Sequence, residues 1–169
     1  MAGNYAWGRG GVRDSIKVMF VCTGNSARSQ MAEGFTRHFG RGRIDAQSAG
    51  MEPSRLNPFA VAVMREKGVD ISGQWSKGFD EALARSMDLV VTVCGNADGR
   101  CPVLPPEVKR LHWPLEDPAA ATGSNDQILA TFREVRDQVE VRVRELVRRI
   151  VPAPRDFVGR CVAVAEGRD

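Results

Sequence analysis

The stretch IKVMFVCTGNSARSQMAEGF, residues 16–35, decides the fold. Its first six residues form a short apolar run rich in β-branched side chains, which predicts a buried strand. Gly24 and Asn25 then interrupt the run. From residue 26 onward apolar side chains recur at helical spacing until Gly40, where a helix is expected to end. A strand, a tight loop and a helix in this order are the beginning of a βαβ unit.

The remainder of the chain continues this alternation. Further strands are expected at residues 44–48, 88–94 and 109–113, and further helices at 57–68, 79–86 and 126–150. The alternation predicts an α/β fold, a small parallel sheet with helices on both faces. We expect a flexible N-terminal extension over residues 1–15, one domain over 16–151 and a tail over 152–169. An apolar patch in that tail could add an edge strand.

Composition limits the function. The 169 residues are 43% hydrophobic and 27% charged, with a formal net charge of +3. No apolar run approaches the ~20 residues of a membrane span, and no signal peptide stands at the N-terminus. No cluster of Lys and Arg marks a nucleic-acid site. These features predict a cytoplasmic protein, expected to be a monomer, that binds neither membrane nor nucleic acid.

Four cysteines, Cys22, Cys94, Cys101 and Cys161, are too few for a disulfide scaffold in a chain of this length. A metal site is disfavoured because there are only two histidines and no Cys-x-x-Cys or His-x-x-His spacing. Catalytic or redox thiols are the leading hypothesis, with inert buried cysteines as the alternative. We predict no bound metal or cofactor.

The segment from Cys22 to Ser29 joins the first predicted strand to the first helix. Such a loop aims backbone N–H groups and the positive end of the helix at one point, which favours a tetrahedral oxyanion. The expected oxyanion-binding residues are Cys22, Thr23, Gly24, Asn25, Ser26, Ala27 and Arg28. The same N–H groups, the Arg28 guanidinium and a hydrogen bond from Ser29 favour the Cys22 thiolate. Cys22, Arg28 and Ser29 are therefore predicted to be catalytic.

The segment VCTGNSARSQMAEGF resembles the active-site segment of thioredoxin-coupled arsenate reductases, which share the low-molecular-weight protein tyrosine phosphatase fold. The likeness extends through SAG at 48–50, DLVVTVCGNAD, CPVLPP and HWPLEDPA, and covers about residues 16–150. It implies a four-stranded parallel sheet, arsenate and arsenite as substrate and product, and thioredoxin as the source of reducing equivalents. Phosphate or sulfate could occupy the same loop.

The resemblance also implies a general acid, because a departing oxygen needs a proton donor. Asp117, followed by Pro118, matches that position, and the neighbouring Glu116 is its rival. Tyrosine phosphatases of this fold typically carry a tyrosine after the Asp-Pro pair. Here the residue is Ala119, which argues against a phosphotyrosine substrate.

A cysteine relay is the second implication. Cys94 is expected at the end of a strand, and Cys101 follows in a polar loop with turn-favouring residues. Because the carboxyl ends of parallel strands meet at one edge of a sheet, Cys94 and Cys22 can be brought together there. The resemblance implies that Cys94 attacks Cys22 and that Cys101 then attacks Cys94. The resulting Cys94–Cys101 disulfide would be reduced by thioredoxin.

Several residues have weaker claims. Asn25, Glu33 and Ser48 match family positions that orient the anion loop, and in some members they bind potassium together with an Asp. Lys77 takes the position of that Asp, so its ammonium could replace the ion. The alternative is an ordinary surface lysine. Trp75 and Trp113 are predicted to be packing residues rather than stacking residues, and Cys161 is predicted to be dispensable.

Two other functions remain open on the sequence. One is a low-molecular-weight phosphatase that hydrolyses phosphate monoesters, and the other is a non-catalytic thiol module that binds arsenite or senses oxidants. Cys94, Cys101 and Ala119 favour the reductase over the phosphatase. Arg28 and Asp117 favour an enzyme over a simple thiol binder, because thiol binding needs neither.

Overall fold

The computed structural model describes residues 15–93, 95 and 103–151. The sheet has four parallel strands in the order β2-β1-β3-β4. The strands are β1 (Ile16–Cys22), β2 (Ile44–Gly50), β3 (Leu89–Thr92) and β4 (Lys109–His112). The first strand therefore lies in the middle of the sheet, with its last five residues buried. Cys22 stands at its carboxyl end, in register with Gly50 of β2.

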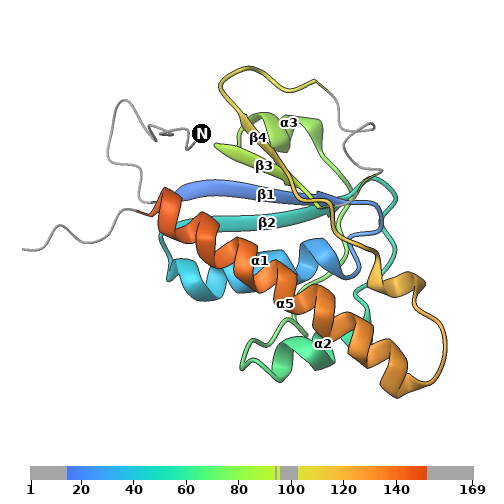
Figure 1. The fold of residues 1–169 in the computed structure, drawn as a ribbon. Helices are drawn as coiled ribbons and strands as arrows, with labels where there is room; N and C mark the ends of the chain where they lie inside the picture. The colour runs from blue at the N-terminus through green and yellow to red at the C-terminus, as the bar shows by residue number, and fades with distance from the viewer. Residues whose placement is uncertain (1–14, 94, 96–102, 152–169) are drawn as a thin grey trace, which may run out of the picture.

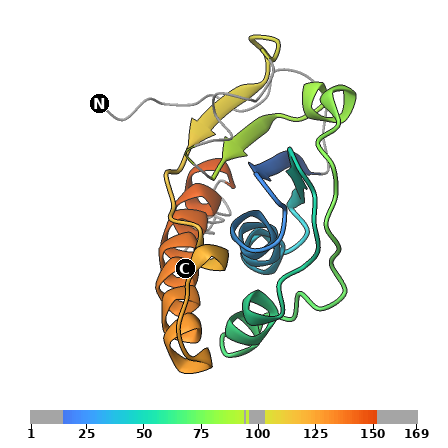
Figure 2. The ribbon, with the colours of Figure 1, turned by 90° about the vertical axis from the view of Figure 1, so that its right-hand side faces the viewer.

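Helices lie on both sides of this sheet. They are α1 (Arg28–Gly40), α2 (Pro58–Arg65), α3 (Glu81–Arg85) and α5 (Asn125–Ile150), with a short 3-10 turn, η1, at Pro118–Ala120. Helices α1 and α5 pack against each other beneath one face, and α3 lies on the opposite side (Figures 1 and 2). The predicted fold, a four-stranded parallel sheet flanked by helices on both faces, is confirmed.

Most element boundaries differ from expectation by one or two residues, and the differences that follow are the clearest. The second helix ends at Arg65 rather than residue 68, because turns that include Gly68 at φ +72° replace the helix. The strand expected over 88–94 is limited to Leu89–Thr92. The loop expected over 114–124 contains η1, which begins at a proline whose ring suits a helical first turn. The edge strand suggested for the tail lies outside the described residues.

Ionic contacts connect α2 to α5 and so support the side of the molecule that carries α1. The Glu66 carboxylate lies 2.8 Å from the Arg133 guanidinium and 2.6 Å from that of Arg136. The hydrogen bond from Arg133, followed by that from Arg136, lowers the pKa of Glu66 to about 2 against the opposing effect of desolvation. The charged side chains of Glu66, Arg133 and Arg136 therefore have a structural role, which is to hold α2 against α5.

Trp75 and Trp113 differ in how far their side chains are exposed. Trp113 is 7% exposed and its ring lies 5.7 Å from that of Phe20, as the prediction of a packing role requires. Trp75 is 67% exposed, with the Lys77 ammonium 5.1 Å from its ring centroid, so the prediction for Trp75 was wrong. A tryptophan after an irregular segment carries no periodicity from which its burial could be predicted.

Within the described part of the chain, no helix is long and apolar enough to cross a membrane.

Candidate active site

The anion loop, residues 22–28, leaves the carboxyl end of the central strand β1 and enters α1. Ligand sites of open parallel sheets lie at this edge. The loop wraps around one point because Asn25 adopts φ +46°, a left-handed conformation that few residues other than glycine adopt and that asparagine tolerates. The backbone thereby reverses direction within a few residues of the Cys22 sulfur.

The backbone carbonyls of the anion loop are bonded away from this point. Those of Cys22, Thr23 and Gly24 accept hydrogen bonds from the backbone N–H groups of Met51, Glu52 and Ser54, at 3.1, 2.8 and 3.0 Å. The Ser26 carbonyl accepts from the Asn57 N–H at 2.9 Å, and the Ala27 carbonyl from the Met31 N–H at 2.9 Å. The Asn25 carbonyl accepts from the side chain of Gln30 at 3.0 Å. With these carbonyls bonded to other segments, the loop N–H groups are left to face the opposite way, as the Asn25 N–H does toward the Cys22 sulfur.

The N-terminus of α1 has no side-chain cap, whereas the other described helices are capped by side chains. Asn57 caps α2, Asp80 caps α3, Asp117 caps η1 and Ser124 caps α5. The cap position of α1 is Ala27, whose methyl group cannot accept a hydrogen bond. The first N–H groups of α1 are therefore available to a bound anion, and the helix dipole favours negative charge there.

Cys22 is 2% exposed, and its sulfur faces the inside of the loop. The Asn25 N–H donates to the sulfur at 3.1 Å, and the Ser29 hydroxyl lies 2.8 Å from it. Because the N-terminus of α1 has no side-chain cap, the sulfur lies beside the positive end of the helix dipole. This is the geometry expected of a nucleophile.

Arg28 connects the anion loop to the loop that carries Asp117. The Arg28 side chain is buried, and its guanidinium donates to the Leu115 carbonyl at 3.1 Å. Another of its nitrogens lies 3.4 Å from the Asp117 carboxylate, whose side chain is 46% exposed. Asp117 also accepts from the Ala119 N–H at 3.1 Å, which begins η1. An anion gripped by Arg28 would therefore lie next to Asp117.

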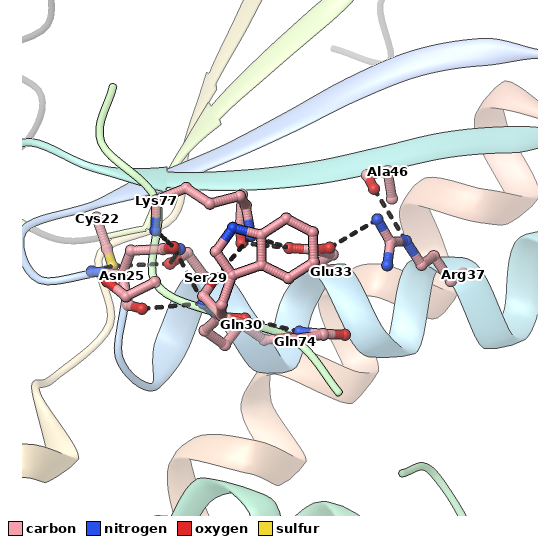
Figure 3. Close-up of polar contacts among 12 residues, drawn as sticks. Cys22, Asn25, Ser29, Gln30, Glu33, Arg37, Ala46, Gln74 and Lys77 are labelled. Atoms are coloured by element: carbon pink, nitrogen blue, oxygen red, sulfur yellow. Dashed lines mark hydrogen bonds and ion pairs between the residues drawn. The ribbon is translucent and has the colours of Figure 1, made fainter. Parts of the chain in front are cut away.

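The four residues assigned to loop orientation form one connected cluster: Figure 3 shows Asn25, Glu33 and Lys77, and Ser48 joins them through its hydrogen bond to Glu33. The Asn25 side chain accepts from the Lys77 backbone N–H at 2.7 Å. The Lys77 ammonium lies 3.4 Å from the Glu33 carboxylate and donates to the Trp75 carbonyl at 2.9 Å. Ser48 donates a short hydrogen bond to Glu33, which is 2% exposed. Among the described residues, no three His, Cys, Asp or Glu side chains gather as a metal site.

Sequence reasoning missed residues that hold the loop from outside. A Cβ on Gly50 would lie 2.7 Å from both the Asn25 nitrogen and the Thr23 oxygen, so only glycine fits beside the loop. Gln30 is fully buried and donates to the Asn25 carbonyl, and Gln74 donates to the Gln30 side chain. Arg37 lies 2.8 Å from Glu33. Gly50 and Gln30 both belong to motifs quoted above, but their contacts are long-range and leave no local pattern.

Cys94, Cys101 and Cys161 lie outside the residues that the structure describes. Of the predicted catalytic residues, the structure brings together Cys22, Arg28, Ser29 and Asp117.

Comparison with known proteins agrees with this geometry. The family model described as low molecular weight phosphotyrosine protein phosphatase matches residues 17–153. The chain belongs to this family, whose members the sequence already resembled.

Within the family, the similar proteins include arsenate reductases. The arsenate reductase of Bacillus subtilis (strain 168) is 47% identical over 128 residues, which are 76% of this chain and 92% of that protein. A solved arsenate reductase in the phosphate-binding state is 44% identical, with a TM-score of 0.65 over 80% of this chain and 98% of the other. A thioredoxin-dependent arsenate reductase of Corynebacterium glutamicum is 28% identical, with a TM-score of 0.67 over 82% of this chain and 63% of the other.

Proposed function

We propose that this protein is an arsenate reductase that transfers electrons from thioredoxin to arsenate through its cysteines. One observation carries the proposal: the chain is 47% identical to an arsenate reductase across 92% of that protein. The geometry supports it, because Cys22 and Arg28 face one anion loop whose N–H groups are directed inward. Arsenate and phosphate are both tetrahedral oxyanions, and a similar arsenate reductase has been solved in a phosphate-binding state.

The first step is attack of the Cys22 thiolate on arsenic. The loop N–H groups and the Arg28 guanidinium hold the oxyanion, which places arsenic near the sulfur. As the sulfur–arsenic bond forms, one hydroxyl group of arsenate leaves and takes a proton from Asp117, so that water departs. Arg28 lies 3.4 Å from the Asp117 carboxyl group, so an anion held by Arg28 has the proposed proton donor beside it.

The second step is the reduction of arsenic. The Cys94 thiolate attacks the Cys22 sulfur, forming the Cys22–Cys94 disulfide, and the electron pair of the sulfur–arsenic bond stays with arsenic. Two thiols are oxidised while arsenic(V) becomes arsenic(III), which leaves as arsenite. Cys101 then attacks Cys94 and releases the Cys22 thiolate. The Cys94–Cys101 disulfide that remains is the substrate of thioredoxin. The roles of Cys94 and Cys101 rest on the resemblance.

Reduction by thioredoxin requires a reducing compartment, so the proposal includes a cytoplasmic location. It also includes arsenic detoxification as the physiological role. The alternative is hydrolysis of phosphate monoesters, which is favoured by the family to which the chain belongs. Hydrolysis needs the anion loop and Asp117 alone, since thiols do not reduce phosphorus(V). Ala119 is exposed on η1 and contributes no ring to a phosphotyrosine cleft.

The deciding experiment measures arsenate-dependent NADPH oxidation with thioredoxin and thioredoxin reductase, beside hydrolysis of p-nitrophenyl phosphate. Cys22→Ser should abolish both activities, because both need the nucleophile. Cys94→Ser and Cys101→Ser should abolish arsenate turnover yet retain hydrolysis. Cys161→Ser is the matched control and should retain both. Full arsenate turnover in Cys94→Ser would contradict the relay, and hydrolysis without arsenate turnover in the unmodified protein would support the phosphatase.

A further inference from the structure

Three side-chain amides are linked by hydrogen bonds in a row that begins in the anion loop. They belong to Asn25, Gln30 and Gln74 (Figure 3). Gln30 donates to the Asn25 carbonyl and to the Asn25 side-chain oxygen, each at 3.0 Å, and to the Trp75 carbonyl at 2.8 Å. Gln74 donates to the Gln30 backbone carbonyl at 3.1 Å and to its side-chain oxygen at 2.7 Å. Gln30 is fully buried, so its amide has no water with which to exchange these bonds.

Backbone groups fix which end of each amide is which. A backbone N–H is always a donor and a backbone carbonyl always an acceptor. The Lys77 N–H therefore requires the oxygen of the Asn25 amide to face it, at 2.7 Å. The carbonyls of Asn25 and Trp75 require the nitrogen of the Gln30 amide to face them. The Gln30 carbonyl fixes the nitrogen of Gln74 in the same way.

This orientation bears on the direction of the hydrogen bond at Cys22. With its oxygen toward Lys77, Asn25 presents its NH₂ group to the Ser29 hydroxyl oxygen at 2.8 Å. That oxygen accepts from Asn25, and toward a Cys22 thiolate, which has no hydrogen to give, the Ser29 hydroxyl is the donor at 2.8 Å. A donated hydrogen bond stabilises the thiolate, whereas the reverse direction would require a thiol.

Gln30 also stands where a glutamine ordinarily closes a helix. It is the third residue of α1, and in a capping box the glutamine at that position accepts from the N–H of the cap residue. Gln127, the third residue of α5, does this with Ser124 at 2.9 Å. Because the oxygen of the Gln30 amide is taken by Gln74, Gln30 turns its nitrogen toward Asn25 instead. The N–H of Ala27 is thus not lost to a cap.

We propose that Gln30, oriented by Gln74, is a positioning residue for the reaction of Cys22. It holds Asn25 in its left-handed conformation and fixes the amide direction through which Ser29 donates to the thiolate, while leaving the N-terminus of α1 open to the anion. The proposal rests on the proposed function only in that Cys22 is the nucleophile. The role of Gln30 depends neither on whether the substrate is arsenate or phosphate nor on the cysteine relay.

The test is the pH dependence of Cys22 alkylation by iodoacetamide in the full chain with Cys94, Cys101 and Cys161 replaced by serine. Gln30→Met and Gln74→Met remove the amides at similar length and without adding charge. The midpoint of the alkylation profile should rise by about one pH unit in Gln30→Met, a tenfold fall in thiolate fraction below the midpoint, and by about half a unit in Gln74→Met. The plateau rate at high pH reports access to the sulfur, so it separates loosened packing from a loss of thiolate.

Gln127→Met is the matched control, since it makes the same change at the same helix position, and its midpoint should equal that of the parent chain in which only the three cysteines are replaced. Circular dichroism establishes that each variant is folded. If Gln30→Met does not fold, Gln74→Met decides alone, because Gln74 is only half-buried and its side-chain amide donates to Gln30. An unchanged midpoint in a folded Gln30→Met or, failing that, in Gln74→Met overturns the proposal. Alkylation involves no arsenate, so absence of reductase turnover would not imitate this result.

Discussion

Helices α1 and α5 both carry a glutamine as their third residue, yet one N-terminus is open and the other is closed. In α5 the Ser124 hydroxyl accepts from the Gln127 N–H and the Gln127 side chain accepts in return, so both donors are satisfied within the helix end. In α1 the cap residue is Ala27, and Gln30 faces away toward Gln74 and Asn25. The same residue type at the same helical position thus has opposite effects.

The difference lies in what surrounds each end. The Ser124 cap is exposed, and its hydrogen bonds stay within four residues. The open end of α1 is held by residues far along the chain, among them Gly50, Gln74 and Lys77. A helix end that must bind an anion cannot stabilise itself with its own side chains, so the remainder of the fold must hold it. The open end should therefore be sensitive to distant substitutions and the closed end should not.

The largest effect is expected from Gly50→Ala. The new methyl group would lie 2.7 Å from the Asn25 nitrogen and the Thr23 oxygen, which are backbone atoms and cannot rotate away. Displacing the loop should reduce both arsenate turnover and p-nitrophenyl phosphate hydrolysis by at least about 10²-fold. The overpacked core should lose about 1–3 kcal/mol in the free energy of unfolding, measured by urea denaturation.

Gly73→Ala is the control for this substitution, because nothing lies within 4 Å of a Cβ at Gly73. Its turnover and stability should stay close to those of the unmodified protein. Equal losses in the two variants would show that helix and turn propensity, and not the close approach to the anion loop, explains the effect of Gly50→Ala.

A smaller loss is expected from Asp117→Asn, which tests whether the open helix end needs an acid supplied by another loop. Asparagine preserves the side-chain acceptor that begins η1 but cannot give a proton. Turnover should fall by about 10²-fold with little change in stability, since the Asp117 side chain is 46% exposed. Glu116→Gln, beside it and exposed, should leave turnover unchanged; the reverse ranking would assign the acid to Glu116.

The sequence was sufficient for the parts of the site that are local. Cys22, Gly24, Asn25 and Arg28 lie within one strand, loop and helix, and each residue type meets a demand of the same anion. Strands β1 and β3 could be predicted because buried parallel strands have continuous apolar runs in their sequence. Asp117 required the family resemblance, because an Asp-Pro pair alone indicates a turn.

The parts that could not be predicted depend on contacts between distant segments. Gln74 reaches Gln30 across 44 positions, and the Lys77 N–H reaches Asn25 across 52. Gln74 and Lys77 lie in an irregular segment without helical or strand periodicity. Nothing in its local sequence pattern therefore predicts that this segment lies against the anion loop. Gly50 could be recognised in the SAG motif, but its reason, the backbone of residues 23–25 at contact distance, becomes visible only in three dimensions.

Ser124→Ala tests the closed end. It removes the hydroxyl that accepts from the Gln127 N–H at 3.3 Å and should cost about 1 kcal/mol in the free energy of unfolding. Turnover should remain near that of the unmodified protein, because the side-chain contact serves only the start of α5. A loss of turnover as large as that of Asp117→Asn would show that the cap also positions the acid, and would remove the contrast between the two helix ends.

The smallest effect is expected from Lys77→Ala, which asks how much of the support for the open end is electrostatic. The Lys77 backbone N–H holds Asn25 whatever the side chain is, whereas the ammonium, 3.4 Å from Glu33, neutralises a buried carboxylate. Glu33 keeps its ion pair with Arg37 at 2.8 Å and its hydrogen bond from Ser48, so the variant should lose no more than about 1 kcal/mol in the free energy of unfolding.

If the Lys77 ammonium replaces a bound cation, exchanging potassium for sodium at constant ionic strength should not alter turnover of the unmodified enzyme. Lys77→Asp should create a potassium response, because it places a second carboxylate beside Glu33 and removes the fixed charge. Potassium activation of the unmodified enzyme would contradict this role and leave Lys77 as an ordinary partly exposed lysine.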